Sequence, residues 1–169
     1  SIEIQVTKDT YVMCDWFNIE SHQDPQVWIY KYNCPESADW HWDYHQLLSN
    51  CTTPAPGVEF GFGPEGEGQS ASITDDQGRW LYEDLAPGTW YWEEHFPDGY
   101  SGAVVYCQWV DPHGSGEFQK AELDGATLWL ELDDDQVVTC YWFDFPDGHA
   151  PASPTPPSGS GGSSGGSGG

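Results

Sequence analysis

The segment "TDDQGRWLYEDLAPGTWYWEEHFPDGY", Thr74 to Tyr100, contains the alternation that decides the fold class. Its glycines and prolines lie between short aromatic runs, which is typical of β-strands separated by tight turns. In the run Thr89–His95, alternate residues point to one face of the predicted strand, so Glu94 shares a face with Trp90 and Trp92. A carboxylate beside two indoles is expected to be buried, and its position therefore needs a chemical reason.

Similar β-rich runs, separated by turn residues, extend over most of the chain. Strands are predicted at Ile2–Thr7, Tyr11–Asn18, Val27–Asn33, Val58–Phe62, Ser70–Thr74, Arg79–Tyr82, Thr89–His95, Ala103–Trp109, Thr127–Leu132 and Val137–Phe145. The segment Ser37–Asn50 instead has apolar residues at helical spacing, with Ser37 or Asp39 as the expected N-cap. Many short strands at close spacing predict an all-β, antiparallel sandwich with one short helical insert.

The beginning of the chain repeats a pattern found near its end. The sequence "YVMCDWFNIE" (Tyr11–Glu20) aligns with "VVTCYWFDFP" (Val137–Pro146), and "IEIQVTKD" ahead of the first aligns with "LWLELDDD" ahead of the second. Each copy reads as strand, polar turn, strand, which predicts a β-hairpin that occurs twice. The chain therefore divides into an N-terminal hairpin (1–20), a β-sandwich (26–146) and a Pro/Ser/Gly-rich flexible linker (147–169), natural or engineered in origin.

The composition excludes several classes of function. In 169 residues there are 28 Asp and Glu against four Lys and Arg, a formal net charge of −24. Such a chain lacks the cations that neutralise nucleic-acid phosphates, and it has no run of about 18 apolar residues that would insert into a membrane. No cofactor is expected, although the acidic turns Asp75–Gly78 and Asp133–Asp135 could bind calcium through oxygen atoms. Asn50 begins an N-glycosylation sequon, "NCT".

Five cysteines are spread along the chain, and none forms a CxxC pair of the kind found in zinc ribbons. Their spacing favours disulfides and an oxidising compartment over five reduced buried thiols. We expect one disulfide between Cys34 and Cys51, across the helical insert. A second is expected between Cys107 and Cys140, which join two neighbouring strands or cross the sandwich. Cys14 is then unpaired, or pairs with another chain.

The Thr74–Tyr100 block resembles the repeat core of the Cna-B-type (SpaA-like, prealbumin-like) domains of bacterial surface proteins. That core reads T-D-x-x-G, a strand, L-x-x-G-x-Y, a strand that ends in Glu, and P-x-G-Y; here Trp90 replaces the usual Tyr. The run "VWIYKYNCP" (Val27–Pro35) resembles the first strand of the family and "CYWFDFP" (Cys140–Pro146) resembles the last. The resemblance covers the predicted sandwich and implies a prealbumin-like, reverse-Ig topology, in a variant that contains cysteines.

Many domains of this family form an intramolecular isopeptide bond between a first-strand Lys and a last-strand Asn or Asp, beside a buried acid. The resemblance assigns these roles to Lys31, Asp144 and Glu94, with Asn18 as an alternative acceptor in the duplicated hairpin. Separately, the period of two places each of the first three in phase with apolar neighbours on its own strand. Burial favours the neutral amine and the protonated carboxyl that the reaction needs. The alternatives are an unreacted buried network and a Lys31 that faces solvent.

The resemblance implies a non-enzymatic, extracellular structural or spacer module of a bacterial cell-surface adhesin, stalk or fibre, with at most one self-processing turnover. Its partners would be tandem modules or other copies, with a host or glycan ligand also compatible. The N-terminal hairpin would end a preceding module, add strands to the sheet edge of another copy, or pack on its own domain.

A carbohydrate-binding module is the alternative function, because ten tryptophans on a β-sandwich suit stacking on sugars. The positions of three of these tryptophans distinguish the binding module from the spacer module. If Trp28, Trp80 and Trp109 line one exposed flat face, the binding module is favoured, and if they fill the core, the spacer is favoured.

Overall fold

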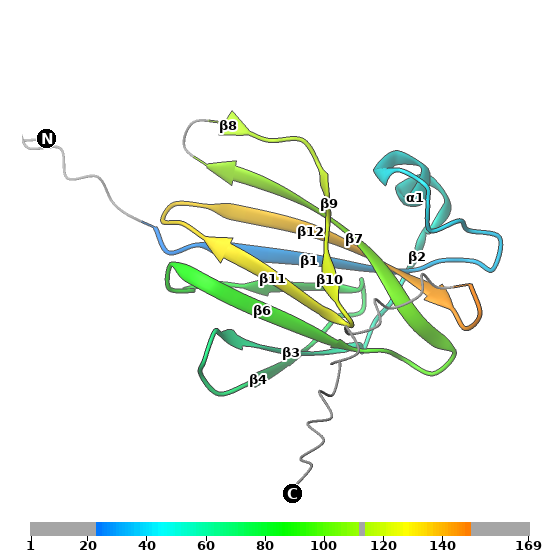
Figure 1. The fold of residues 1–169 in the computed structure, drawn as a ribbon, viewed down its shortest axis with the longest axis horizontal. Helices are drawn as coiled ribbons and strands as arrows, with labels where there is room; N and C mark the ends of the chain where they lie inside the picture. Colours follow the sequence, from blue (N-terminus) through cyan, green and yellow to red (C-terminus); the bar gives the residue numbers. More distant parts are fainter. Residues whose placement is uncertain (1–22, 112–113, 150–169) are drawn as a thin grey trace, which may run out of the picture.

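The computed structural model describes residues 23–111 and 114–149, and the predicted N-terminal hairpin and most of the predicted linker lie outside these ranges. Twelve strands and one helix form the described part of the chain (Figure 1). Their bounds are β1 Gln26–Asn33, α1 Tyr44–Asn50, β2 Thr53–Pro54, β3 Glu59–Pro64, β4 Ser70–Ile73, β5 Arg79–Tyr82, β6 Gly88–His95, β7 Tyr100–Asp111, β8 Gly114–Ser115, β9 Gln119–Ala121, β10 Leu123–Asp124, β11 Thr127–Leu132 and β12 Val137–Pro146.

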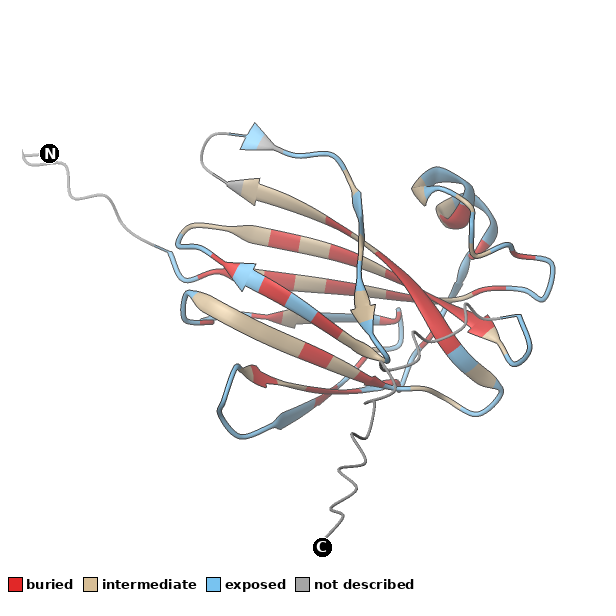
Figure 2. Cartoon of the chain, viewed as in Figure 1, coloured by how far each residue is buried: buried red, intermediate tan, exposed pale blue. Residues whose placement is uncertain are grey.

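The strands form two sheets that face each other, so the predicted β-sandwich is confirmed. The first sheet has seven strands, in the order β2-β1-β12-β7-β8, with β5 also paired to β1 and β9 to β7. The second sheet has five strands, in the order β10-β11-β6-β3-β4. Buried and less buried positions alternate along the central strands (Figure 2), because successive side chains point to opposite faces of each sheet. The inward rows form the main apolar core, which includes Ile29, Phe60, Trp92 and Trp142.

One pairing departs from the antiparallel pattern. β1 and β12 lie side by side and run parallel, from Gln26 beside Val137 to Asn33 beside Asp144. The remaining pairings of the described strands are antiparallel. The first and last strands of the sandwich therefore begin at the same end of the sheet and finish at the other end.

The prediction that Leu128–Pro146 forms a hairpin is wrong. β11 pairs with β6 in the five-stranded sheet, whereas β12 lies between β1 and β7 in the seven-stranded sheet. Since both edges of β12 are occupied, β11 has no place beside it, and the acidic turn Asp133–Asp135 carries the chain from one sheet to the other. The unit that the N-terminal sequence duplicates is thus a crossing between two sheets.

The helical insert is shorter than predicted. It begins at Tyr44, and Asp43 is the N-cap instead of Ser37 or Asp39. The Asp43 carboxylate accepts a hydrogen bond from the Gln46 backbone N–H, and the Gln46 side chain accepts one from the Asp43 N–H. This reciprocal capping box fixes the first turn at that point. No helix within the described ranges is long and apolar enough to cross a membrane.

A second apolar cluster lies between α1 and the outer face of the seven-stranded sheet. Leu47 of α1 is fully buried there together with Phe143 and Phe145 of β12. The end of β12 is consequently covered on both faces, by the five-stranded sheet on one side and by the helical insert on the other. Asp144 lies between the two phenylalanines, on the opposite face of the strand.

Candidate functional site: a buried Lys–Glu–Asp cluster

Three ionisable side chains from three strands meet inside the sandwich. Lys31 of β1 and Asp144 of β12 come from the seven-stranded sheet, and Glu94 of β6 comes from the facing sheet. The Lys31 side chain has no exposed surface, and neither do the side chains of Glu94 and Asp144. The phase of each strand placed these residues inward, and the structure brings all three together. Lys31 does not face solvent.

The lysine ammonium group is the centre of the cluster. Lys31 Nζ lies 2.7 Å from Glu94 Oε1 and is also in direct contact with Asp144 Oδ1. Apart from one another, these polar atoms have no hydrogen-bond partner in the described part of the chain. Lys31 is therefore paired with both carboxyl groups, those of Glu94 and Asp144, in a site that has no exposed surface.

The backbone of Lys31 is held by two loops on the side of β1 that faces away from β12. Its N–H donates to Gly78 O at 2.7 Å, and its carbonyl accepts from Ala55 N at 3.0 Å. Gly78 has φ +69°, and a Cβ at this position would lie 2.5 Å from the carbonyl oxygen of Lys31. Only glycine fits this approach without a shift of the backbone, so Gly78 helps to fix the position of Lys31.

The walls of the site are aromatic. The Trp142 ring centroid lies 5.9 Å from Lys31 Nζ, and Phe60 packs edge-on against Trp142 with centroids 5.0 Å apart. Burial in this surrounding raises the pKa of Glu94 to about 8, against the opposing effect of the lysine charge. Burial also raises the pKa of Asp144. Because one lysine cannot balance two carboxylates in a dry core, one carboxyl group keeps a proton near neutral pH.

Two disulfides flank the cluster. Cys34, which directly follows β1, is joined to Cys51 at the end of α1. Its N–H also donates to the Asp144 carbonyl at 2.8 Å. Cys107 is joined to Cys140, and the two residues are direct partners on β7 and β12. Of the two arrangements left open for this pair, the structure has neighbouring strands, not a bond across the sandwich.

The remaining predicted site residues are not part of this cluster. Cys14 and Asn18 lie outside the described residues. Asn50 is the last residue of α1, and its side-chain amide donates to the Gln46 carbonyl at 2.7 Å. The turn Asp75–Gly78 was considered above as a calcium-binding turn. In this turn, the Asp75 carboxylate accepts hydrogen bonds from the backbone N–H groups of Gln77 and Arg79. Within residues 23–111 and 114–149, no group of three or more His, Cys, Asp or Glu side chains could hold a metal ion.

The three tryptophans that separate the two functions do not line one flat face. Trp28 is half-buried and Trp80 is 39% exposed, and both line one hollow together with Arg79. Trp109 lies elsewhere, half-buried against the main core. The aromatic rings on the outer face of β1 and β12 stack on one another, as Tyr30 and Tyr141 do at 5.0 Å.

Sequence reasoning missed two parts of the site. The sequence predicts Gly78 only as a turn residue, although its place in the T-D-x-x-G pattern is a signal that its backbone conformation matters. The cover that α1 forms over Phe143 and Phe145 was also missed. Its only signal was the unbroken apolar character of "WFDF", which is typical of a strand buried on both faces.

These features define a class: a two-sheet β-sandwich with disulfides and a buried Lys–Glu–Asp cluster that joins its first and last long strands. No model of a known protein family matches the chain, and no curated protein matches it. The chain is similar to a solved structure, the major pilin from Streptococcus pyogenes, with a TM-score of 0.32 and 11% sequence identity. The similar region covers 73% of this chain and 48% of the pilin chain, so the chain spans about half the length of that protein.

Proposed function

We propose that the chain is a load-bearing structural module of an extracellular surface protein or fibre of the Cna-B type, and that an isopeptide bond joins Lys31 to Asp144. The observation that carries the proposal is the direct contact of Lys31 Nζ with both Asp144 and Glu94 in a site without exposed surface. A buried charge network alone is an inefficient way to stabilise a core, since apolar side chains of similar volume often do as well or better. An isopeptide bond between Lys31 and Asp144 would explain why the core contains a buried charged cluster.

The proposed reaction is a condensation that the cluster can complete by itself. The Lys31 ammonium group gives a proton to a carboxylate, and the neutral amine attacks the Asp144 carboxyl carbon. Glu94, with a pKa of about 8, carries the proton that polarises the acceptor and later protonates the leaving hydroxyl. A C–N bond forms, a C–O bond breaks, and one water leaves. Each chain reacts once, so this is self-processing and not enzyme activity in the usual sense.

The parallel pairing of β1 and β12 supports a mechanical role. A load applied ahead of Gln26 and behind Pro146 pulls the two neighbouring strands in opposite directions along their length. With the bond in place, tension passes from β1 through Lys31 and Asp144 to the end of β12. The remaining strands then carry no load, and the sheets cannot be unzipped.

The duplicated N-terminal segment fits the end of a preceding module of the same kind. In the sandwich, the matching segment 128–146 crosses between the two sheets, with β11 in one and β12 in the other. A segment of this pattern buries both of its strands only where two sheets are available, and this favours a tandem module over a hairpin added to one sheet edge. In a preceding module, Asn18 would be the acceptor that corresponds to Asp144, and Cys14 would correspond to Cys140.

The same features support an extracellular location. Two disulfides persist in oxidising compartments and are rare in the cytosol of most cells. The strong negative charge keeps such a surface protein soluble. The proposed partners are therefore tandem modules or other copies of the same surface protein.

The test is the intact mass of the fully reduced protein. We expect a mass about 18 Da below the value calculated from the sequence, the loss of one water, and a branched peptide that contains Lys31 and Asp144 after proteolysis. A bond from Lys31 to Asn18 would instead release ammonia, about 17 Da. Lys31→Arg abolishes the loss, and Lys120→Met, which removes an exposed lysine, keeps it. Separate, unmodified Lys31 and Asp144 peptides from the native chain would refute the proposal.

A further inference from the structure

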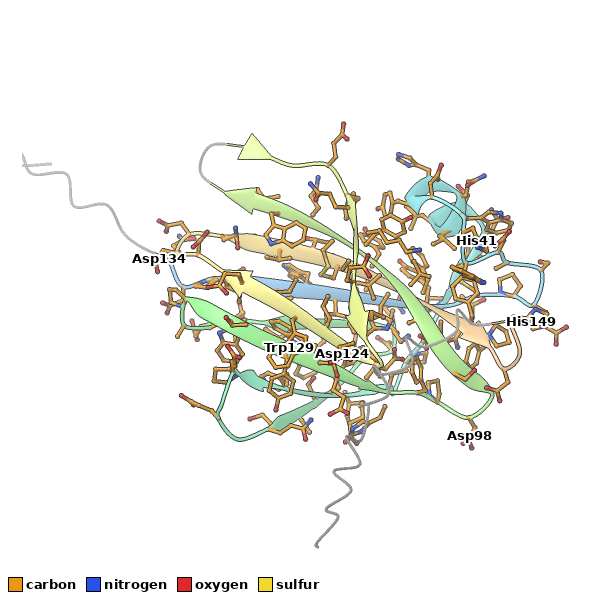
Figure 3. All side chains as sticks on the ribbon, in the orientation of Figure 1. His41, Asp98, Asp124, Trp129, Asp134 and His149 are labelled. Atoms are coloured by element: carbon orange, nitrogen blue, oxygen red, sulfur yellow. A yellow bond between two sulfur atoms is a disulfide. The ribbon has the colours of Figure 1, made fainter. Side chains whose placement is uncertain are left out.

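A hollow opens at one edge of the sandwich, where the chain crosses from one sheet to the other. β9 pairs with β7 in the seven-stranded sheet and β10 pairs with β11 in the five-stranded sheet, so Glu122 between them spans the gap. Figure 3 shows Asp124 and Trp129 near this crossing. The hollow has a volume of about 610 Å³, within the range of sites for small ligands.

Aromatic and aliphatic side chains line the hollow. Trp109, Leu123 and Leu130 line it and also belong to, or pack against, the main core. Trp129 lines it as well and is 45% exposed, whereas Trp92 and Trp142 are completely buried. One side of the Trp129 ring packs against Tyr91, with ring centroids 5.4 Å apart, and the hollow is therefore lined by two indoles, one of them well exposed.

The polar groups of the hollow are almost entirely hydrogen-bond acceptors. Its lining residues include Glu122, Asp124 and Glu131, and none of them is a lysine, an arginine, an amide or a hydroxyl residue. One oxygen of Glu131 accepts a hydrogen bond from the Thr89 hydroxyl at 2.7 Å, and its other oxygen remains as an acceptor. The neighbouring cation Lys120 lies over the ring of Trp40, 5.7 Å from its centroid, and does not line the hollow. A ligand that matches this lining donates many hydrogen bonds, carries no negative charge and has a flat apolar face.

We infer that this hollow is a binding site for a short pyranose glycan that carries no acidic groups. Sugar hydroxyl groups donate to the three carboxylates, and the C–H face of a pyranose ring packs on Trp129. Amino sugars bind more tightly than neutral sugars, because an ammonium group adds charge attraction to the same acceptors and to the indole face. Uronic acids are repelled. The site is separate from the Lys31 cluster, so it adds a ligand-binding role to the structural role proposed above.

Binding is tested by titration calorimetry and by tryptophan fluorescence, with tetrasaccharides of glucose, mannose, N-acetylglucosamine and glucosamine as probes. We expect at least one neutral or amino tetrasaccharide to bind, and oligogalacturonate not to bind. Trp129→Ala weakens binding by about tenfold or more, as removal of a central aromatic anchor does. Glu131→Gln weakens it less. Trp80→Ala is the matched control, because Trp80 is similarly exposed but lines a different hollow, and it leaves the affinity unchanged.

The fold of each variant is checked by near-UV circular dichroism and by the mass of the reduced chain. The inference is overturned if no tetrasaccharide binds to the native chain, or if Trp129→Ala binds as tightly as the native protein. Binding of lysine oligomers alone, lost at high salt, would show that the hollow attracts basic peptides and would also overturn it. An unchanged mass of the native chain would refute the isopeptide bond and leave the glycan site intact, so the two failures are distinguishable.

Discussion

A pulling experiment would test the proposed bond most directly, because its presence changes an extension that the structure lets us calculate. With the proposed bond in place, tension applied ahead of Gln26 and behind Pro146 crosses from Lys31 to Asp144, so only a few residues at each end can stretch. Glu94→Gln keeps Lys31 and Asp144 as a balanced buried pair but removes the proton carrier, so we expect this variant to fold and to remain unlinked. Lys31→Met removes the amine itself.

The length released by the unlinked variants follows from the disulfides. About 120 residues separate Gln26 from Pro146, and the closed disulfides remove segments of 17 and 33 residues from the extensible path. About 70 residues remain, and they extend to roughly 240 Å at ~3.4 Å per residue, before the initial separation of the two ends is subtracted. After reduction, the same variants release roughly 400 Å.

Single-molecule force spectroscopy on the module, held between two marker domains, measures these lengths. The native chain should show no step of this size, with or without reductant, while Glu94→Gln and Lys31→Met show the shorter step when oxidised and the longer step when reduced. Lys120→Met serves as the control for loss of a lysine and should behave as the native chain does. A step of roughly 240 Å from the oxidised native chain would refute the reasoning.

Three further predictions concern the site and its surroundings. For chain that is isolated in the denatured state before it has folded, and is therefore unlinked, the rate of water loss on refolding, measured by mass, should fall as the pH rises above about 8, because Glu94 then loses the proton that burial retains. In the Glu94→Gln background, Gly78→Ala should lower the free energy of unfolding in urea by about 2 kcal/mol or more, and by more than Gly57→Ala, since Gly57 also has a positive φ but has open space around it. In the same background, reduction of the β7–β12 disulfide, which closes a 33-residue loop, should lower the free energy of unfolding by about 3–4 kcal/mol, measured by the shift of the urea midpoint; an unchanged midpoint would contradict this prediction.

Local patterns predicted the long strands well. The eight predicted strands between Val27 and Phe145 correspond to β1, β3, β4, β5, β6, β7, β11 and β12, with differences of a few residues at their ends. The inward phase of Lys31, Glu94 and Asp144 followed from the period of two. The strands β2, β8, β9 and β10 were not predicted, because segments of two or three residues carry no measurable alternation and are fixed by the neighbours with which they pair.

The arrangement of strands in space was less accessible from the sequence. The acidic turn before β12 reads like a hairpin turn, and only the two occupied edges of β12 show that the chain must cross to the other sheet. The parallel pairing of β1 with β12 has no local signal, since it joins segments about 110 residues apart. In the same way, the N-cap at Asp43 depended on a capping box that competes with earlier candidates, and the sequence alone did not rank them.

The helical insert connects the fold to the proposed chemistry. A strand of an antiparallel sandwich commonly has one face packed on the core and the other face in contact with solvent. Here Phe143 and Phe145, on either side of Asp144, are covered by α1, and the disulfide from Cys34 to Cys51 ties that cover to the end of β1. The same tie places the Cys34 N–H against the Asp144 carbonyl. The insert thus covers the outer face of β12 on either side of Asp144, the residue whose carboxyl pKa is raised by burial.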